Sequence, residues 1–261
     1  MHKFFFIFLY LGLTAVYASQ EETKNILFKL ETEFSTSQEA KVSADLNVWD
    51  PAVQGYNSKL KHAWILGGGF EYILTPWIST DLSFFYRDGY KYRKSQTPAV
   101  AVGGVYYGDS KFRLFNLAIS SLMLSLNIKG NGLRGWHYQD EEQGSLYPVI
   151  SAGIGGSYQK VTNFYTIRDP NAASAPIKRA SSIGADTKTT SLSYHLGLGI
   201  EYQKDTWFFS IGYRWFDPGQ FKCPSYLIDN LLGSNSGIVV PPWKVRFQAH
   251  EFTLSVKKLV F

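Results

Sequence analysis

The chain has 261 residues, of which 23 are glycine and 16% are aromatic, and its formal net charge is +5. Its single cysteine, Cys223, excludes an intramolecular disulfide. After the N-terminal segment, no run of about 18 apolar residues would supply a helical membrane span.

The N-terminus has the layout of a secretory signal peptide. Lys3 precedes an uncharged apolar run from Phe4 to Tyr17, and small residues precede a cleavage point between Ala18 and Ser19. The apolar run is short for a helical span. We therefore predict a cleaved signal peptide over residues 1–18 and a single exported domain over residues 19–261.

Two segments near the N-terminus alternate between apolar and polar residues. These are Ile26–Ser35 and Val42–Val48. Because a strand turns successive side chains to opposite faces, each segment predicts a strand with one apolar face. The pattern leaves open which of the two is the first spanning strand.

Two hairpins with the same design follow. The first joins Trp64–Leu74 to Trp77–Arg87, and the second joins Ser191–Gln203 to Trp207–Phe216. Each strand has about ten residues, an apolar face and a face of polar residues and glycine. A very short turn separates the strands of each pair, and a tryptophan follows it. This pattern is typical of a membrane-spanning β-barrel.

Three further segments complete the strands. Phe112–Lys129 changes its apolar phase near Ser120-Ser121, which predicts a β-bulge there. Tyr147–Gln159 and Val245–Phe261 alternate regularly.

The connections between strands are unequal in length. Three of them, Asp88–Lys111, Val161–Thr190 and Asp217–Lys244, each exceed 20 residues. Outer-membrane barrels have short periplasmic turns and long outer loops. We interpret Gly130–Leu146, which contains an acidic run, as a solvated periplasmic connection. The sequence thus predicts an all-β fold, a closed antiparallel up-and-down transmembrane β-barrel of eight strands. Ten strands is the alternative.

The segments that carry a family resemblance are GGGFEYILTPWISTDLSFFY, LYPVISAGIGGSY, YHLGLGIEYQKDTWFFSIGYRW and HEFTLSVKKLVF. With these, the chain resembles the small outer-membrane β-barrels of Gram-negative bacteria, the OmpA-like and opacity-protein-like surface antigens. The resemblance implies an outer-membrane location, contact with membrane lipid and lipopolysaccharide, and insertion by the barrel-insertion machinery. Leu259 and Phe261 match the C-terminal insertion signal of that family. The resemblance concerns architecture, because a fold does not fix an activity.

Seven charged residues fall on the polar faces of the predicted strands. An eight-stranded barrel has an interior just wide enough for side chains, so opposite charges there are expected to pair and plug the lumen. A charged constriction in a narrow pore is the alternative. The seven residues are Glu71, Asp81, Arg87, Lys129, Glu201, Arg214 and Lys257.

The predicted outer loops are rich in basic and aromatic residues. Clustered cations favour acidic partners such as lipopolysaccharide phosphates or acidic glycans. We therefore hypothesise a structural or adhesin-like surface role with a host or cell-surface ligand, and no nucleic-acid binding. A narrow porin-like channel is the alternative. The residues singled out are Lys91, Arg93, Lys94, Arg168, Lys178, Arg179, Lys222 and Trp243.

Catalysis is not expected. His195 shares a face with Ser193 and Glu201, but residues two apart on a strand are separated by about 7 Å, which is too far for a ready triad. Cys223 lies in a proline-flanked loop without a plausible base. No Cys/His spacing indicates a metal site, and we expect no cofactor.

Overall fold

The structure, a computed structural model, describes residues 25–43, 58–96, 111–132, 138–140, 144–168, 180–228, 238–240, 242 and 244–260. The predicted signal peptide, with Ala18 and Ser19, lies outside these ranges, as does Phe261. No helix of the described residues is long and apolar enough to cross a membrane.

Eight antiparallel strands form a closed barrel. Each pairs with the next along the chain, and β16 closes the ring by pairing with β1, for example Phe34 with Phe252. The predicted eight-stranded barrel is confirmed, and the ten-stranded alternative is wrong. The eight strands are β1 (Ile26–Ser37), β4 (His62–Thr75), β5 (Ile78–Gln96), β6 (Lys111–Lys129), β8 (Gly144–Arg168), β10 (Thr187–Lys204), β11 (Trp207–Asp217) and β16 (Ala249–Leu259).

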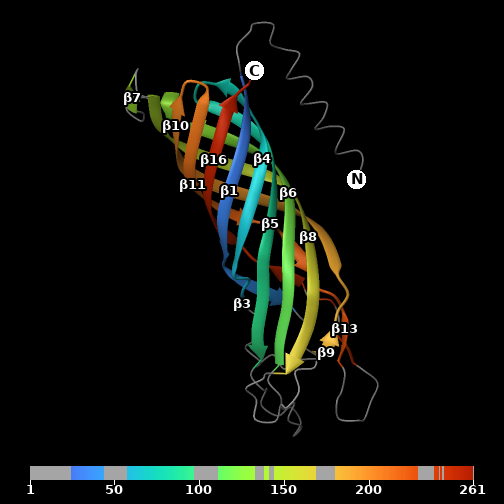
Figure 1. Ribbon diagram of the computed structural model, residues 1–261. Coiled ribbons are helices and arrows are strands. Elements are labelled where there is room, and N and C mark those ends of the chain that lie inside the picture. The colour runs from blue at the N-terminus through green and yellow to red at the C-terminus, as the bar shows by residue number, and fades with distance from the viewer. Residues whose placement is uncertain are drawn as a thin grey trace, which may run out of the picture.

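The first N-terminal segment is the spanning one. β1 pairs with β4 and β16 over its whole length. The described part of the second segment lies in β2 (Glu39–Ser43), which belongs to a small four-stranded sheet and not to the ring of spanning strands. The short turns at Pro76-Trp77 and Asp205-Thr206 lie at the same end of the barrel as the start of β1 and the end of β16 (Figure 1). We call this the turn end, and the opposite end the loop end.

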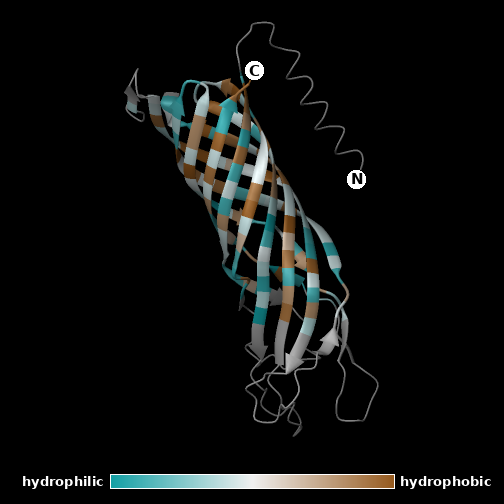
Figure 2. Ribbon diagram, viewed as in Figure 1, coloured by the Kyte–Doolittle hydropathy of each residue, from teal (hydrophilic) through white to brown (hydrophobic). Residues whose placement is uncertain are grey.

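Large apolar side chains cover the outside of the barrel. Hydrophobic and hydrophilic residues alternate along the strands (Figure 2). Leu66, Leu198 and Trp64 are 69%, 63% and 68% exposed, whereas the neighbouring residues Ile65 and Ala63 are buried. Exposed apolar surface of this extent marks contact with a membrane. The strands therefore present their apolar face to lipid.

The predicted β-bulge in β6 is wrong. β6 keeps a regular register with both neighbours through Ser120 and Ser121. Phe115, Leu117 and Ile119 face the interior, on the same side as Ser121 and the later polar residues. The apparent change of phase arises because the strand leaves the bilayer: its apolar residues face outward in lipid and inward beyond it.

The same inversion corrects two of the predicted long loops. β5 continues to Gln96 and β8 to Arg168, so the first nine residues of Asp88–Lys111 and the first eight of Val161–Thr190 are strand. In β5 the register shifts between Arg87 and Tyr90, next to Gly89, whose φ is +106°. After this shift, Tyr90 and Tyr92 face the interior and Lys91 faces solvent. The barrel wall therefore extends beyond the membrane at the loop end.

The interior of this extension is apolar. Stacked rings of Tyr92 and Phe115 have centroids 4.8 Å apart, and Phe115 also contacts the rings of Phe164 and Phe221. We call this cluster the outer aromatic core. It comprises Ala40, Leu60, Ala63, Tyr90, Tyr92, Phe115, Leu117, Ile119, Val161, Phe164, Phe221, Cys223, Val245, Phe247 and Ala249.

Short strands complete the described residues. Their positions correct the third predicted loop, Asp217–Lys244, and the start of the predicted last strand, because both regions contain separate strands. β12 (Gln220–Lys222), β15 (Lys244–Arg246), β2 and β3 (Ser58–Lys59) form a four-stranded sheet. The others are β7 (Tyr138–Asp140), β9 (Ala180–Ile183), β13 (Tyr226–Ile228), β14 (Ile238–Val240) and the 3-10 turn η1 (Gly130–Gly132).

Two neighbouring glycines of β8 give a matched test of packing against the wall. A Cβ on Gly155 would lie 2.0 Å from the backbone oxygen of Leu122, whereas a Cβ on Gly156 would meet nothing within 4 Å. We expect Gly155→Ala to lower the free energy of unfolding by about 1–3 kcal/mol. Gly156→Ala serves as the control and should leave it unchanged within about 0.5 kcal/mol. Urea titration of the refolded barrels measures both, and equal stabilities would contradict the close approach.

Candidate functional site: the charged lumen

The interior of the membrane-spanning part holds two layers of ion pairs. All seven lumen residues expected from the sequence have buried side chains inside the barrel. Together with four further charged residues they make five cations and six carboxylates among the described residues of the network. The four are Lys29, Glu31, Glu33 and Glu251.

The lower ion-pair layer lies near the turn end and joins two lysines to two glutamates. Lys257 Nζ lies 2.6 Å from a carboxylate oxygen of Glu71 and 2.6 Å from one of Glu201. Lys129 Nζ contacts the other oxygens of the same two residues, at 2.6 and 3.4 Å. Tyr147 donates a hydrogen bond of 2.9 Å to Glu201. Each carboxylate is therefore shared by two ammonium groups, a geometry that compensates burial.

The upper ion-pair layer lies closer to the loop end and is built around two arginines. Arg87 contacts Glu251 through two hydrogen bonds, Nε to Oε1 at 2.8 Å and Nη2 to Oε2 at 3.1 Å. Arg214 binds Glu31, and its Nη1 lies 2.8 Å from Glu33 Oε1. Bidentate and shared arginine–carboxylate contacts are among the strongest polar interactions in proteins.

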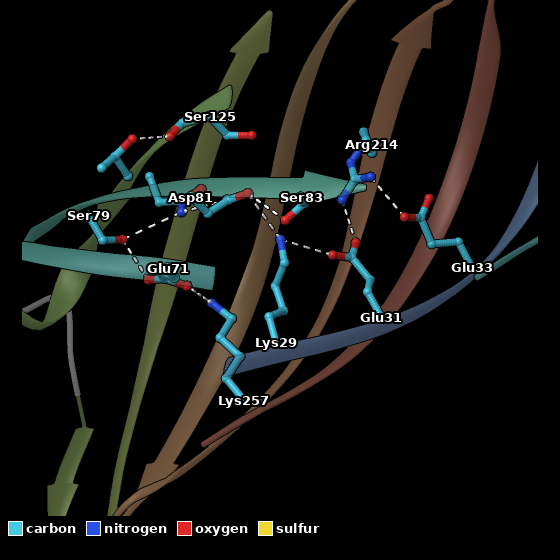
Figure 3. Close-up of polar contacts among 12 residues, drawn as sticks. Lys29, Glu31, Glu33, Glu71, Ser79, Asp81, Ser83, Ser125, Arg214 and Lys257 are labelled. Carbon is cyan, nitrogen blue, oxygen red and sulfur yellow. Dashed lines mark hydrogen bonds and ion pairs between the residues drawn. The ribbon is translucent and has the colours of Figure 1, made fainter. Parts of the chain in front are cut away.

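Lys29 connects this layer toward the lower one (Figure 3). Its Nζ lies 3.2 Å from Glu31 and 3.3 Å from Asp81. Asp81 in turn accepts hydrogen bonds from Ser83 and Asn127. The upper ion-pair layer comprises Lys29, Glu31, Glu33, Asp81, Arg87, Arg214 and Glu251.

Aromatic rings border the upper ion-pair layer. The guanidinium carbon of Arg87 lies 3.8 Å from the ring centroid of Phe216 and 5.2 Å from that of Phe85. Arg214 lies 4.6 Å from the centroid of Phe85. These cation–π contacts leave little room around the arginines. Beyond them the outer aromatic core fills the extension, so charge and then apolar packing occupy the interior in succession.

A small cavity remains beside the network. Its volume is about 80 Å³, and it is lined by charged and hydroxyl side chains including Lys29, Asp81 and Ser125. His195 also lines it, and its Nδ1 has no hydrogen-bond partner among the described residues. A polar space of this size can hold a few water molecules. It is smaller than an ordinary small-molecule pocket of about 300 Å³ or more.

Three of the charges missing from the sequence-based set lie on β1. Lys29, Glu31 and Glu33 face the lumen in alternation with the outward-facing residues of β1. They were not assigned because two N-terminal segments competed for the first strand. Glu251 is the fourth, and it lies on the inward face of β16. The partner of a charge across the lumen depends on the register of strands far apart in sequence, which alternation does not reveal.

The residues expected on outer loops are distributed differently. Lys91 and Arg93 are exposed but stand on β5, and Lys222 is exposed on β12. Lys94 and Arg168 belong to the ends of β5 and β8. Leu259, part of the predicted C-terminal insertion signal, is the last residue of β16. The described structure thus places these basic residues on strands, because the wall extends beyond the membrane. Lys178, Arg179 and Trp243 lie outside the described residues.

Comparison with known proteins finds similarity in strand arrangement only. No family model matches the chain, and no curated protein gives a significant match. Neisserial surface protein A is 12% identical, with a TM-score of 0.42, over 89% of this chain and 97% of that one. The outer membrane protein OprG from Pseudomonas aeruginosa is 12% identical, with a TM-score of 0.45, over 90% and 97%.

The outer membrane protease OmpT from Escherichia coli is 11% identical, with a TM-score of 0.44, over 93% of this chain and 99% of that one. Such likenesses say nothing of activity, and the barrel assignment depends on the strand pairing described above. The chain is a closed eight-stranded transmembrane β-barrel, similar in its strand arrangement to outer-membrane proteins of Gram-negative bacteria.

Proposed function

We propose that this protein is an outer-membrane barrel with a closed lumen, which acts through its surface beyond the membrane. The observation that supports the proposal best is the succession of buried ion pairs and apolar side chains along the interior. The lower and upper ion-pair layers occupy the membrane-spanning part, and the outer aromatic core occupies the extension. A solute would have to break several buried ion pairs to pass. Binding therefore falls to the outer strands and loops, as in a surface or adhesin-like protein.

The location and partners follow from the same proposal. The apolar outer wall fits a bilayer, and the β4–β5 and β10–β11 connections at the turn end have only two residues each. This is the asymmetry of outer-membrane barrels. We therefore propose that the signal peptide directs export, that lipopolysaccharide and outer-membrane lipid surround the wall, and that the barrel-insertion machinery assembles it.

Planar-bilayer recording tests the closed lumen. The refolded mature chain is expected to give no conductance steps, because two layers of buried ion pairs cross the lumen of the membrane-spanning part. Heat-dependent migration on gels should confirm that the same preparation is folded. Reproducible steps of one size from folded protein would refute the proposal.

A narrow channel is the second candidate, and the polar cavity beside Lys29 is the observation that favours it. Arg214→Ala separates the two, because Arg214 holds both Glu31 and Glu33. For a plug, we expect a loss of stability of about 3–5 kcal/mol and no new conductance. A channel would instead show an altered ion selectivity with little change in stability.

Catalysis is not part of this proposal. Ser193 Oγ donates a hydrogen bond to Met123 Sδ and not to His195, so the two side chains do not form a nucleophile–base pair. His250 lies on the outside of the barrel wall, where it contacts Gln38 and Tyr213. These contacts are consistent with a structural role for His250.

A further inference from the structure

The small sheet at the loop end has two unlike faces. β12, β15, β2 and β3 are antiparallel neighbours in that order. On one face Ala40, Phe221 and Val245 are fully buried in the outer aromatic core. The opposite face is exposed and, among the described residues, carries five cations and one carboxylate. These are Lys41, Lys59, Lys222, Lys244, Arg246 and Glu39.

Cations lie directly opposite one another on this face. Lys222 pairs with Lys244 across β12 and β15, and Arg246 pairs with Lys41 across β15 and β2. Residues opposite each other on one face have Cβ atoms about 5 Å apart, and like charges there destabilise a sheet. On the same face Glu39 is opposite Lys59, and Arg246 lies 2.9 Å from Asp217. A bound anion would turn the repulsion into attraction.

The charged face is held in place from behind. The ring of Phe221 contacts those of Phe115 and Phe247 at centroid distances of 6.0 and 6.3 Å. The sheet is also joined to β10, because the backbone N–H of Lys222 donates a hydrogen bond of 3.2 Å to Thr189 Oγ1. The spacing of the cations is therefore set before any ligand arrives, which lowers the entropy lost on binding.

The face adjoins the lipid-exposed wall. Arg246 Nη2 lies 2.6 Å from the hydroxyl of Tyr194 and 2.9 Å from Asp217 Oδ2. The Tyr194 ring packs on Trp215, on the outward side of β10 and β11. Aromatic residues of this kind mark the membrane–water boundary of a barrel. The cations thus begin where the apolar wall ends, at the depth of lipid headgroups.

We infer that this face, named here the basic sheet, binds the phosphate groups of a lipid in the outer leaflet. The inference rests on the proposed outer-membrane location and assigns a specific site to it. Lysine ammonium groups on adjacent strands, with Arg246 at their edge, bind phosphates as charge-assisted hydrogen-bond donors. A phosphorylated glycolipid such as lipopolysaccharide supplies two or more such anions at this depth.

A matched pair of variants tests the basic sheet. Lys41→Gln/Lys222→Gln removes two exposed cations from it, and Lys91→Gln/Lys204→Gln removes two exposed cations that lie on β5 and at the turn end of β10. The probe is fluorescent lipopolysaccharide without its long polysaccharide, added to refolded protein in detergent, with anisotropy as the readout. We expect the first variant to bind about 10-fold more weakly and the second to bind within about 2-fold of the unchanged protein.

Two further arms identify the ligand chemistry. The same lipopolysaccharide stripped of phosphate should bind no better than the first variant binds the intact lipid. A heparin-derived oligosaccharide should compete weakly. Equal losses in both variants, or undiminished binding of the dephosphorylated lipid, would overturn the inference. Preferential binding of heparin, lost in Lys41→Gln/Lys222→Gln, would replace it with a sulfated-glycan site.

Two further measurements distinguish a failure of the proposed closed lumen from a failure of the basic sheet. Gel migration and planar-bilayer recording are done on the same preparations. If the folded barrel gives no conductance steps and binds lipopolysaccharide equally well with and without its phosphates, the phosphate site on the basic sheet alone is overturned. A conducting barrel that binds phosphate overturns the closed lumen alone.

Discussion

Replacing Arg87 with alanine is expected to lower the free energy of unfolding by about 3–5 kcal/mol, which is a large effect for a single substitution. Arg87 is fully buried and makes two hydrogen bonds to Glu251. Its removal leaves that carboxylate with Arg214 at 3.9 Å as its remaining ion-pair partner. Urea titration of the barrel refolded into lipid vesicles measures the loss.

The controls separate charge burial from side-chain volume. Lys91→Ala, on the exposed face of the same strand, should change stability by no more than about 0.5 kcal/mol. Arg87→Ala/Glu251→Ala should be less destabilised than the sum of the two single variants, because neither partner is then left alone. Strict additivity in this cycle would mean that the buried pair does not couple, contrary to the geometry.

Phe115→Ala is expected to cost about 3–5 kcal/mol through the cavity that it leaves in the outer aromatic core. Phe115 is 1% exposed and contacts the rings of Tyr92, Phe164 and Phe221. Because this core lies beyond the membrane, the loss should appear first as proteolysis of the extension. The membrane-spanning part should keep its folded migration on gels.

Leu124→Ala is the matched control for this prediction. Leu124 lies on the same strand but faces lipid and is 39% exposed, so its truncation opens no internal cavity. The expected loss is less than about 1 kcal/mol, with no added proteolysis. If both variants lost equal stability, or if Phe115→Ala unfolded the whole barrel at once, the extension would not be a separately packed unit.

Alternation along the strands was sufficient to predict the membrane-spanning part. In lipid, each strand must turn apolar residues outward, so Leu122, Leu124 and Leu126 identify the outer face of β6 without any structure. The inward residues then follow by parity, which is why Arg87 and Glu71 could be assigned to the lumen. The rule that apolar residues face outward no longer holds where a strand passes from lipid into water. In the extension, Phe115 and Leu117 turn inward, and their strand was interpreted as irregular.

The pairing of charges was beyond prediction for a different reason. Parity gives the face of a residue but not its height in the barrel, and height depends on the stagger between all eight strands. Lys257 meets Glu71 and Glu201 from opposite walls, across sequence separations of 186 and 56 residues. The basic sheet was hidden for a similar reason, since Lys41 and Arg246 become neighbours only when β2 and β15 pair.

The ion pairs of the lumen also bear on how the barrel assembles. Arg87 on β5 binds Glu251 on β16, Glu71 on β4 binds Lys129 on β6, and Arg214 on β11 binds Glu31 on β1. None of these strand pairs are neighbours in the sheet. A partly formed sheet in the bilayer would therefore hold unneutralised charges on its inner face. Arg87 and Arg214 reach Glu251 and Glu31 together only when β1 meets β16, so ion pairing in the lumen favours closure of the ring.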